Sequence, residues 1–184
     1  MKLSNIVFYM LTTFALAMTA SNASAAVLVF DNLAIIQHAE ELQGIGNEID
    51  DKGYHLAYAA APDEEYPVGF HAVGQKWPYN GKSIAVLANN CSANTTLTRH
   101  DNSVFSVKSI DLAAVNDDQS YYVSFIGITT EGTTTHLDVY LDNGAKWKRI
   151  VFPATFRNLK SLSWMQGDCT ENPPHMFDNI FLSH

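Results

Sequence analysis

Apolar and polar residues alternate with a period of two in several short runs, a pattern typical of half-buried β-strands. Such runs lie at residues 54–58, 84–86 and 137–141. Further predicted strands cover residues 104–114, 121–128, 147–152, 161–165 and 176–182. Polar turns separate these runs and no βαβ alternation is present. The pattern therefore predicts an all-β fold, an antiparallel jelly-roll β-sandwich in one domain.

Three segments depart from this pattern. Residues 33–42 carry apolar side chains at helical spacing with Glu40 and Glu41 on the other face, which predicts one short N-terminal helix. Residues 44–53 and 61–81 are rich in Gly, Pro and acidic residues, so we expect long loops at one edge of the sandwich, where binding residues tend to lie. Asp142-Asn143-Gly144 predicts a hairpin turn between two strands.

The chain begins like a secretory signal peptide. Met1-Lys2 precedes an apolar stretch at residues 6–17 and the small residues Ala23-Ser24-Ala25. We expect cleavage after Ala25, a single domain over residues 26–184, a periplasmic or secreted location, and no membrane insertion after cleavage. The alternative is a membrane anchor, for which the apolar stretch is short.

The expected mature chain is acidic. Lys2 is the only charge in the first 25 residues, so 10 basic residues remain against 19 acidic residues, and 10 − 19 gives a net charge of −9. This charge argues against nucleic acid and anionic membrane as partners. It is compatible with neutral sugars and divalent cations.

Two cysteines, Cys91 and Cys169, are present. An even number in an exported protein predicts a disulfide, and the alternative is two buried free thiols. No CxxC or Cys/His spacing suggests a zinc or redox centre, so either way the pair is interpreted as structural.

The tripeptide Phe-Asp-Asn occurs at residues 30–32 and again at residues 177–179. If the first and last strands are neighbours, Asp31 and Asp178 lie close together, and strand parity places both on apolar rows. A buried unpaired carboxylate is costly, and either a calcium ion or hydrogen bonds from amide groups relieve that cost. We therefore predict a calcium site at Asp31 and Asp178, with hydrogen-bonded or solvent-facing structural aspartates as the alternative.

Aromatic residues gather in the second predicted loop. Tyr66, His71, Trp77 and Tyr79 lie close in sequence there, and flat rings on loops are what sugar faces stack against. We predict these four residues as a ligand-binding face. The alternative is that Trp77 and the nearby Phe70 cap the end of the core.

Two arrangements of residues could support catalysis. His136-Leu137-Asp138 with His175 is similar in spacing to the His-x-Asp…His triad of jelly-roll iron oxygenases, although His136 and Asp138 facing solvent is the simpler interpretation. A lyase or glycosidase could instead use Tyr121, Tyr122, Arg149 and Asp138 along a groove. The sequence does not bring either set together, so no catalytic residue is assigned.

Residues 80–85, 95–98, 105–112 and 177–180 resemble a family of exported bacterial β-sandwich domains. These domains resemble galactose-binding-like jelly rolls and carbohydrate-binding modules. The resemblance implies the same fold and carbohydrate or cell-surface binding. In related jelly rolls, a structural calcium lies where the first and last strands meet, which is where Asp31 and Asp178 would fall.

The sequence thus favours an exported, non-catalytic binding module with a carbohydrate ligand. Two alternatives stay open: a polysaccharide-acting lyase or glycosidase on the same scaffold, and a purely structural envelope or matrix protein.

Overall fold

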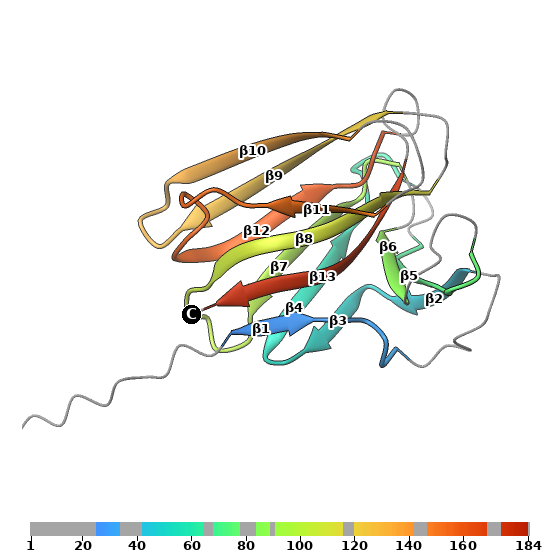
Figure 1. The fold of residues 1–184 in the computed structure, drawn as a ribbon, viewed down its shortest axis with the longest axis horizontal. Helices are drawn as coiled ribbons and strands as arrows, with labels where there is room; N and C mark the ends of the chain where they lie inside the picture. Colours follow the sequence, from blue (N-terminus) through green and yellow to red (C-terminus); the bar gives the residue numbers. More distant parts are fainter. Residues whose placement is uncertain are drawn as a thin grey trace, which may run out of the picture.

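The computed structural model of the protein describes residues 25–33, 42–64, 68–77, 84–88, 91–115, 120–141, 147–168 and 174–183. These residues contain thirteen β-strands and no helix (Figure 1). The strands are β1 (Ala26–Leu28), β2 (Leu42–Gly46), β3 (Glu48–Asp51), β4 (Tyr54–Ala59), β5 (Phe70–Val73), β6 (Ala85–Ala88), β7 (Asn94–Arg99), β8 (Ser106–Ala114), β9 (Tyr121–Thr129), β10 (Thr134–Leu141), β11 (Lys148–Val151), β12 (Leu159–Met165) and β13 (His175–Ser183).

The strands form two sheets. The first sheet has the order β11-β8-β13-β6-β5-β2, with β1 also paired to β13, and the second has the order β10-β9-β12-β7-β4-β3. The strand pairs in both sheets are antiparallel. The chain crosses between the sheets at most of its connections, as it does in jelly rolls. The predicted fold class, an all-β antiparallel sandwich, is confirmed.

Buried and exposed side chains alternate along β9, so this one strand contributes to both the core and the surface. Along β9, Tyr121, Val123 and Phe125 are buried, whereas Tyr122 and Ser124 between them are exposed. Successive side chains of a strand point to opposite faces of its sheet. The buried row therefore faces the other sheet and the exposed row faces solvent.

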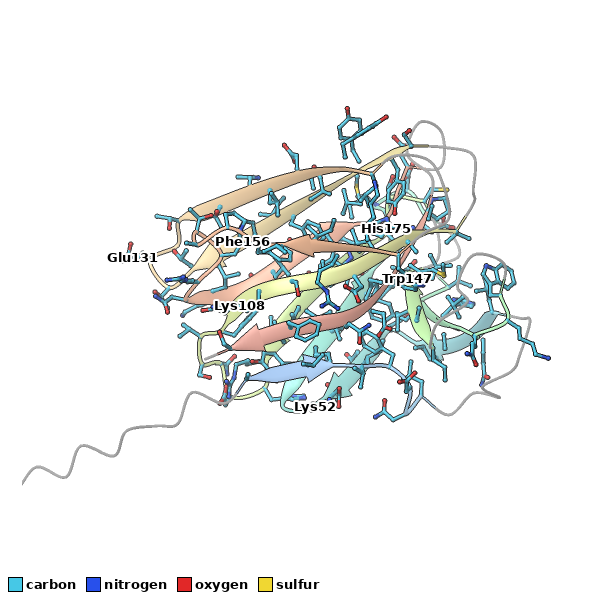
Figure 2. The ribbon with its side chains drawn as sticks, viewed as in Figure 1. Lys52, Lys108, Glu131, Trp147, Phe156 and His175 are labelled. Carbon is cyan, nitrogen blue, oxygen red and sulfur yellow. The ribbon has the colours of Figure 1, made fainter. Side chains whose placement is uncertain are left out.

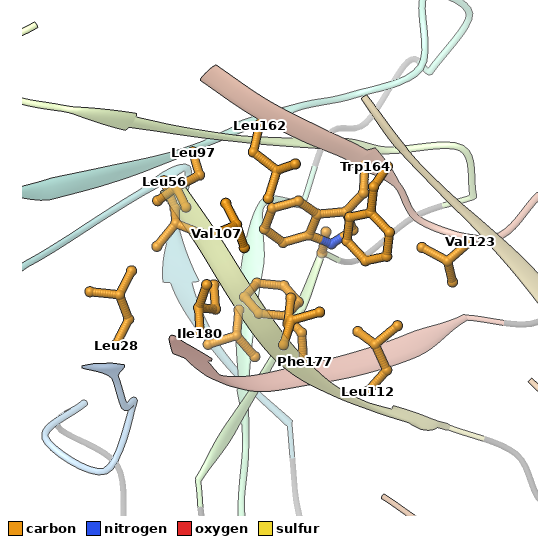
Figure 3. Packing of buried hydrophobic residues seen from close by; sticks show 14 of the residues in the cluster. Leu28, Leu56, Leu97, Val107, Leu112, Val123, Leu162, Trp164, Phe177 and Ile180 are labelled. Carbon is orange, nitrogen blue, oxygen red and sulfur yellow. The ribbon is translucent and has the colours of Figure 1, made fainter. Parts of the chain in front are cut away.

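An aromatic cluster forms the centre of the core between the sheets (Figure 3). The Phe177 ring lies edge-on to Trp164, with 5.2 Å between ring centroids, and edge-on to Phe30 at 5.6 Å. Edge-to-face aromatic pairs are favoured by the ring quadrupole. Since Trp164 comes from the second sheet and Phe177 from the first, these contacts hold the two sheets together.

The two sheets differ on their outer faces. The outer face of the first sheet carries a second apolar cluster of Val73, Ala85, Leu87, Ala113 and Met176, against which Leu42, Trp77, Val115 and Trp147 pack. The outer face of the second sheet instead exposes Tyr122, Ile126, Ile128, Tyr140 and Met165. The second sheet is thus the one with a large apolar and aromatic surface open to solvent.

Several local predictions are wrong. Residues 34–41 of the predicted helix lie outside the described residues, but Leu42 begins β2 rather than ending a helix. The predicted loop at residues 44–53 contains most of β2 and all of β3, and the loop at 61–81 contains β5. These strands are short and lie at or near sheet edges, where Gly and acidic residues are tolerated. β10 pairs with β9, and β11 pairs with β8, so β10 and β11 do not form a hairpin with each other. The predicted turn at Asp142-Asn143-Gly144 lies outside the described residues.

The predicted signal peptide lies outside the described residues, apart from Ala25. Within the described part of the chain, no helix has the length and apolar character needed to cross a membrane.

Candidate ligand-binding face

The two Phe-Asp-Asn segments lie at neighbouring strands, as predicted. β1 pairs with β13, Leu28 being opposite Ile180. Asp178 is buried, but Asp31 is exposed in the turn after β1, where its Oδ1 accepts a hydrogen bond from Ile84 N at 3.2 Å. The inference that both carboxylates point along buried rows is therefore right for Asp178 and wrong for Asp31, because β1 ends at Leu28 and does not continue through the motif.

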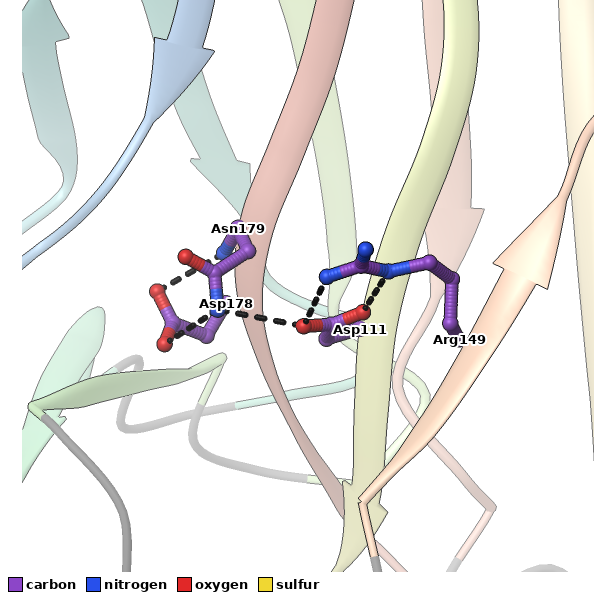
Figure 4. A network of polar contacts seen from close by, with 4 residues as sticks. All are labelled: Asp111, Arg149, Asp178 and Asn179. Atoms are coloured by element: carbon purple, nitrogen blue, oxygen red, sulfur yellow. Dashed lines mark hydrogen bonds and ion pairs between the residues drawn. The ribbon is translucent and has the colours of Figure 1, made fainter.

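Asp178 belongs to a polar network on the outer face of the first sheet (Figure 4). It accepts hydrogen bonds from Asn179 N at 2.7 Å and from Asn179 Nδ2 at 3.0 Å. The same Nδ2 donates to Asp111 Oδ2 at 3.1 Å, and Asp111 is opposite Asp178 in the sheet. Asn179 has a φ of 47°, in the left-handed region that Asn tolerates better than most residues.

Arg149 completes this network by a bidentate ion pair with Asp111. Its Nε donates to Asp111 Oδ1 at 2.8 Å and its Nη2 donates to Asp111 Oδ2 at 3.0 Å. This pairing raises the pKa of Arg149 above its usual value. Hydrogen bonds and an ion pair thus relieve the cost of burying the carboxylates of Asp111 and Asp178.

The predicted loop face is only partly within the described residues. Tyr66 and Tyr79 lie outside them. His71 and Trp77 are half-buried, and Trp77 packs against the second apolar cluster. His71 Nδ1 and Trp77 Nε1 are buried and lack a hydrogen-bond partner in the described structure. Trp77 therefore covers part of the second apolar cluster, while ligand binding by the four residues stays a prediction.

The three residues of the iron-oxygenase-like triad are not brought together. His136 and Asp138 are exposed on the outer face of β10. His175 begins β13 in the other sheet (Figure 2). It is fully buried and stacks on Tyr121, with 5.8 Å between ring centroids. Burial lowers the pKa of His175 to about 4, so this imidazole is neutral near neutral pH.

The four residues considered for a lyase or glycosidase are not all brought together, since only Tyr122 and Asp138 share a face. Tyr121 faces the core, and burial raises the pKa of its hydroxyl. Tyr122 points to the other side of β9, and Arg149 lies on the first sheet, paired with Asp111. The four residues therefore do not line one groove, as such chemistry was expected to require.

A pair of exposed tyrosines on the second sheet was missed by the sequence analysis. Tyr122 of β9 is directly opposite Tyr140 of β10, and their ring centroids are 4.7 Å apart with the planes tilted by 48°. The residues are 59% and 50% exposed. Two aromatic rings thus form one continuous apolar surface open to solvent.

Polar groups flank the tyrosine pair along the same two strands. Ser124 is opposite Asp138, and Ser124 Oγ donates a hydrogen bond to Asp138 Oδ1 at 2.6 Å. Residues two apart on a strand share a face, so both side chains lie beside the rings. We call Tyr122, Ser124, Asp138 and Tyr140 the tyrosine face.

At the far end of the β9–β10 hairpin is an open hollow of about 210 Å³ lined by Thr129, Thr130, Glu131, Thr133, Arg157 and Asn158.

The comparisons with known proteins find similarity only at the level of structure. No family model matches the chain, and no curated protein matches it. The family 29 carbohydrate binding module CBM29_1 from Piromyces equi is similar, with 10% identity, 88% of this chain and 91% of that chain covered, and a TM-score of 0.47. A DUF4465 family protein from Bacteroides ovatus is similar with 11% identity, 89% and 100% coverage, and a TM-score of 0.47.

Proposed function

We propose that this protein is a non-catalytic carbohydrate-binding module that binds its ligand through the tyrosine face. The observation that carries the proposal is the pair of exposed, adjacent rings of Tyr122 and Tyr140. The CH-rich face of a pyranose packs well on a phenol ring. Covering an exposed ring also removes apolar surface from water, which favours binding.

The neighbouring polar groups supply orientation. Asp138 accepts hydrogen bonds and Ser124 both donates and accepts, so together they match the mixed character of sugar hydroxyls. The surface is an open sheet face, which suits an extended glycan chain better than a small molecule that needs enclosure. A polysaccharide-acting enzyme is less well supported, because Tyr121 and Arg149 lie away from the face that carries Tyr122 and Asp138.

Replacing both tyrosines (Tyr122→Ala with Tyr140→Ala) should weaken glycan binding about tenfold or more, because each aromatic contact contributes roughly 0.5–1.5 kcal/mol beyond its buried area. The measurement is a glycan array with the wild-type protein, followed by calorimetry on the best soluble oligosaccharide. The matched variant with phenylalanine at both positions keeps the ring faces and should bind within a few-fold of wild type.

Two further variants locate the ligand. Val151→Ala removes an exposed apolar side chain from the other sheet and should leave binding unchanged. If Trp77→Ala abolishes binding and the double tyrosine variant does not, the ligand lies at the predicted loop face of Tyr66, His71, Trp77 and Tyr79. Absence of glycan binding by the wild-type protein would contradict the proposal, and turnover of a bound polysaccharide would favour the enzyme.

An exported location, periplasmic or secreted, and a Cys91–Cys169 disulfide belong to the same proposal. Cys91 has no free thiol, and Cys169 lies outside the described residues. Ser92 N donates to Gly167 O at 2.9 Å, so the backbone beside Cys91 lies against the segment that leads to Cys169. The acidic composition supports the further expectation that neither nucleic acid nor an anionic membrane is a partner.

A structural calcium at Asp31 and Asp178 also stays a proposal, supported by the pairing of β1 with β13. On this proposal, adding Ca²⁺ on the order of 1 mM to protein treated with a calcium chelator should raise the melting temperature. The rise should be absent in Asp31→Asn, which changes an exposed side chain and leaves the buried network intact. An unchanged melting temperature in the wild-type protein would exclude the ion.

A further inference from the structure

A tight hairpin places a carboxylate directly beside an imidazole at the edge of the second sheet. β3 and β4 are joined by Lys52 and Gly53, which have φ values of 50° and 81°. Two positive φ angles define the two-residue turn that matches the twist of a hairpin, and such a turn sets the strand register. The register pairs Asp50 with His55, and both point to the outer face because their neighbours Ile49, Tyr54 and Leu56 are buried.

A second imidazole comes from the next strand. His100 follows β7 directly, and its backbone N–H donates to Gly53 O at 3.1 Å, which ties it to the hairpin turn. β7 pairs with β4 so that Thr98 is opposite His55. His100 is therefore the diagonal neighbour of His55 on the same face, a position from which long side chains reach each other.

The three side chains converge on one point. Asp50 Oδ1 is 2.7 Å from His55 Nδ1 and 3.0 Å from His100 Nε2, and one potential ligand atom of each residue lies within 4.8 Å of the other two. Ligand atoms bound to one tetrahedral zinc ion are about 3.3–3.6 Å apart, given metal–ligand distances of roughly 2.0–2.2 Å. Small adjustments of exposed side chains would thus admit an ion between them.

The relative position of the rings points the same way. The ring centroids of His55 and His100 are 5.6 Å apart and the planes are tilted by 53°. Two imidazoles bound to one tetrahedral zinc ion have centroids about 5–5.5 Å apart. The rings therefore converge from two directions and do not stack on each other.

The surrounding charges favour a cation. The adjacent Arg99 is neutralised by a bidentate pair with Asp101, which also accepts hydrogen bonds from Ser103. Lys52 is turned toward Val27 O and lies 3.8 Å from Asp51. Asp50 thus provides a net negative charge within the cluster.

We propose that Asp50, His55 and His100 form a surface site for a divalent transition metal ion, with zinc as the ion that this set of two imidazoles and one carboxylate suits best. Three protein ligands leave one position of a tetrahedral ion open. The site lies at the opposite edge of the same sheet from the tyrosine face, so it is independent of carbohydrate binding.

The test is a titration of untagged, full-length protein with Zn²⁺ by calorimetry, together with equilibrium dialysis and elemental analysis. The expected result is one zinc ion per chain and a melting temperature that rises with zinc. Asp50→Ala, His55→Ala and His100→Ala should each weaken binding at least tenfold. His136→Ala is the matched control, because it removes an exposed histidine from the far edge of the same sheet and should leave zinc affinity unchanged.

Two results would overturn the proposal. One is wild-type protein that retains no zinc after dialysis. The other is an equal zinc affinity of the wild type and the three variants. In that case Asp50 only accepts hydrogen bonds from the two histidines, and the cluster does not bind a metal ion. Unfolding curves without metal that match the wild type show that the variants are folded. If His55→Ala is unstable, His100→Gln replaces it in the test, because His100 lies beyond the end of β7.

Discussion

Replacement of Phe177 by alanine is expected to lower the free energy of unfolding by about 3–5 kcal/mol, the usual cost of deleting a fully buried aromatic ring. Phe177 is fully buried and its ring contacts Trp164, Phe30 and Phe70. The surrounding rings come from both sheets and from the segment after β1, so they cannot close over the cavity without moving strands. Urea unfolding followed by fluorescence and circular dichroism measures the loss.

The control for this prediction is Val151→Ala, at a side chain that is 71% exposed. It should change the free energy of unfolding by less than about 0.5 kcal/mol. A loss below about 1 kcal/mol for Phe177→Ala would mean that the ring is not at the centre of the core.

Acidification should destabilise the protein through His175, by about 3 kcal/mol between pH 6.5 and pH 4. The pKa of His175 in the folded state is about 4 because the ring is fully buried, whereas an unfolded histidine titrates near pH 6.5. In this window the unfolded state binds more protons than the folded state, so stability is present at neutral pH and is lost as the pH falls.

The matched variant is His175→Phe, which keeps a flat ring against Tyr121 and removes the titrating group. Neither ring nitrogen of His175 has a hydrogen-bond partner in the described part of the structure, so the substitution breaks no bond seen there. Unfolding free energies at pH 7 and at pH 4.5 should differ more for the wild type than for the variant. Equal pH dependence of the two proteins would show that His175 is not buried in its neutral form.

Most of the strands could be predicted from the sequence because apolar and polar residues alternate along them. β9 and β10 are nine and eight residues long, and in both strands every second residue is exposed while the residues between are buried or half-buried. β2 and β3 were missed because their Gly and acidic residues are compatible with pairing at an edge but carry little strand signal. The Asp142-Asn143-Gly144 turn was misread because turn chemistry does not show whether the next strand returns to the same sheet.

The candidate sites depended on pairings that a linear pattern does not contain. The Phe-Asp-Asn repeat correctly predicted that β1 and β13 are neighbours, but the turn that exposes Asp31 was not visible in the alternation. Tyr122 and Tyr140 meet because of the β9–β10 register, which sets every pair along the hairpin. The pairing of Asp50 with His55 follows from the short Lys52-Gly53 turn and could have been predicted, whereas His100 joins them only through the sheet order.

Carbohydrate binding through the tyrosine face can be tested by an NMR titration of isotope-labelled protein with an oligosaccharide that the glycan array selects. Amide and ring shift changes should be centred on Tyr122, Ser124, Asp138 and Tyr140, and they should saturate with the affinity measured by calorimetry. Shift changes confined to His71 and Trp77, or no shift changes with any oligosaccharide, would contradict binding at this face.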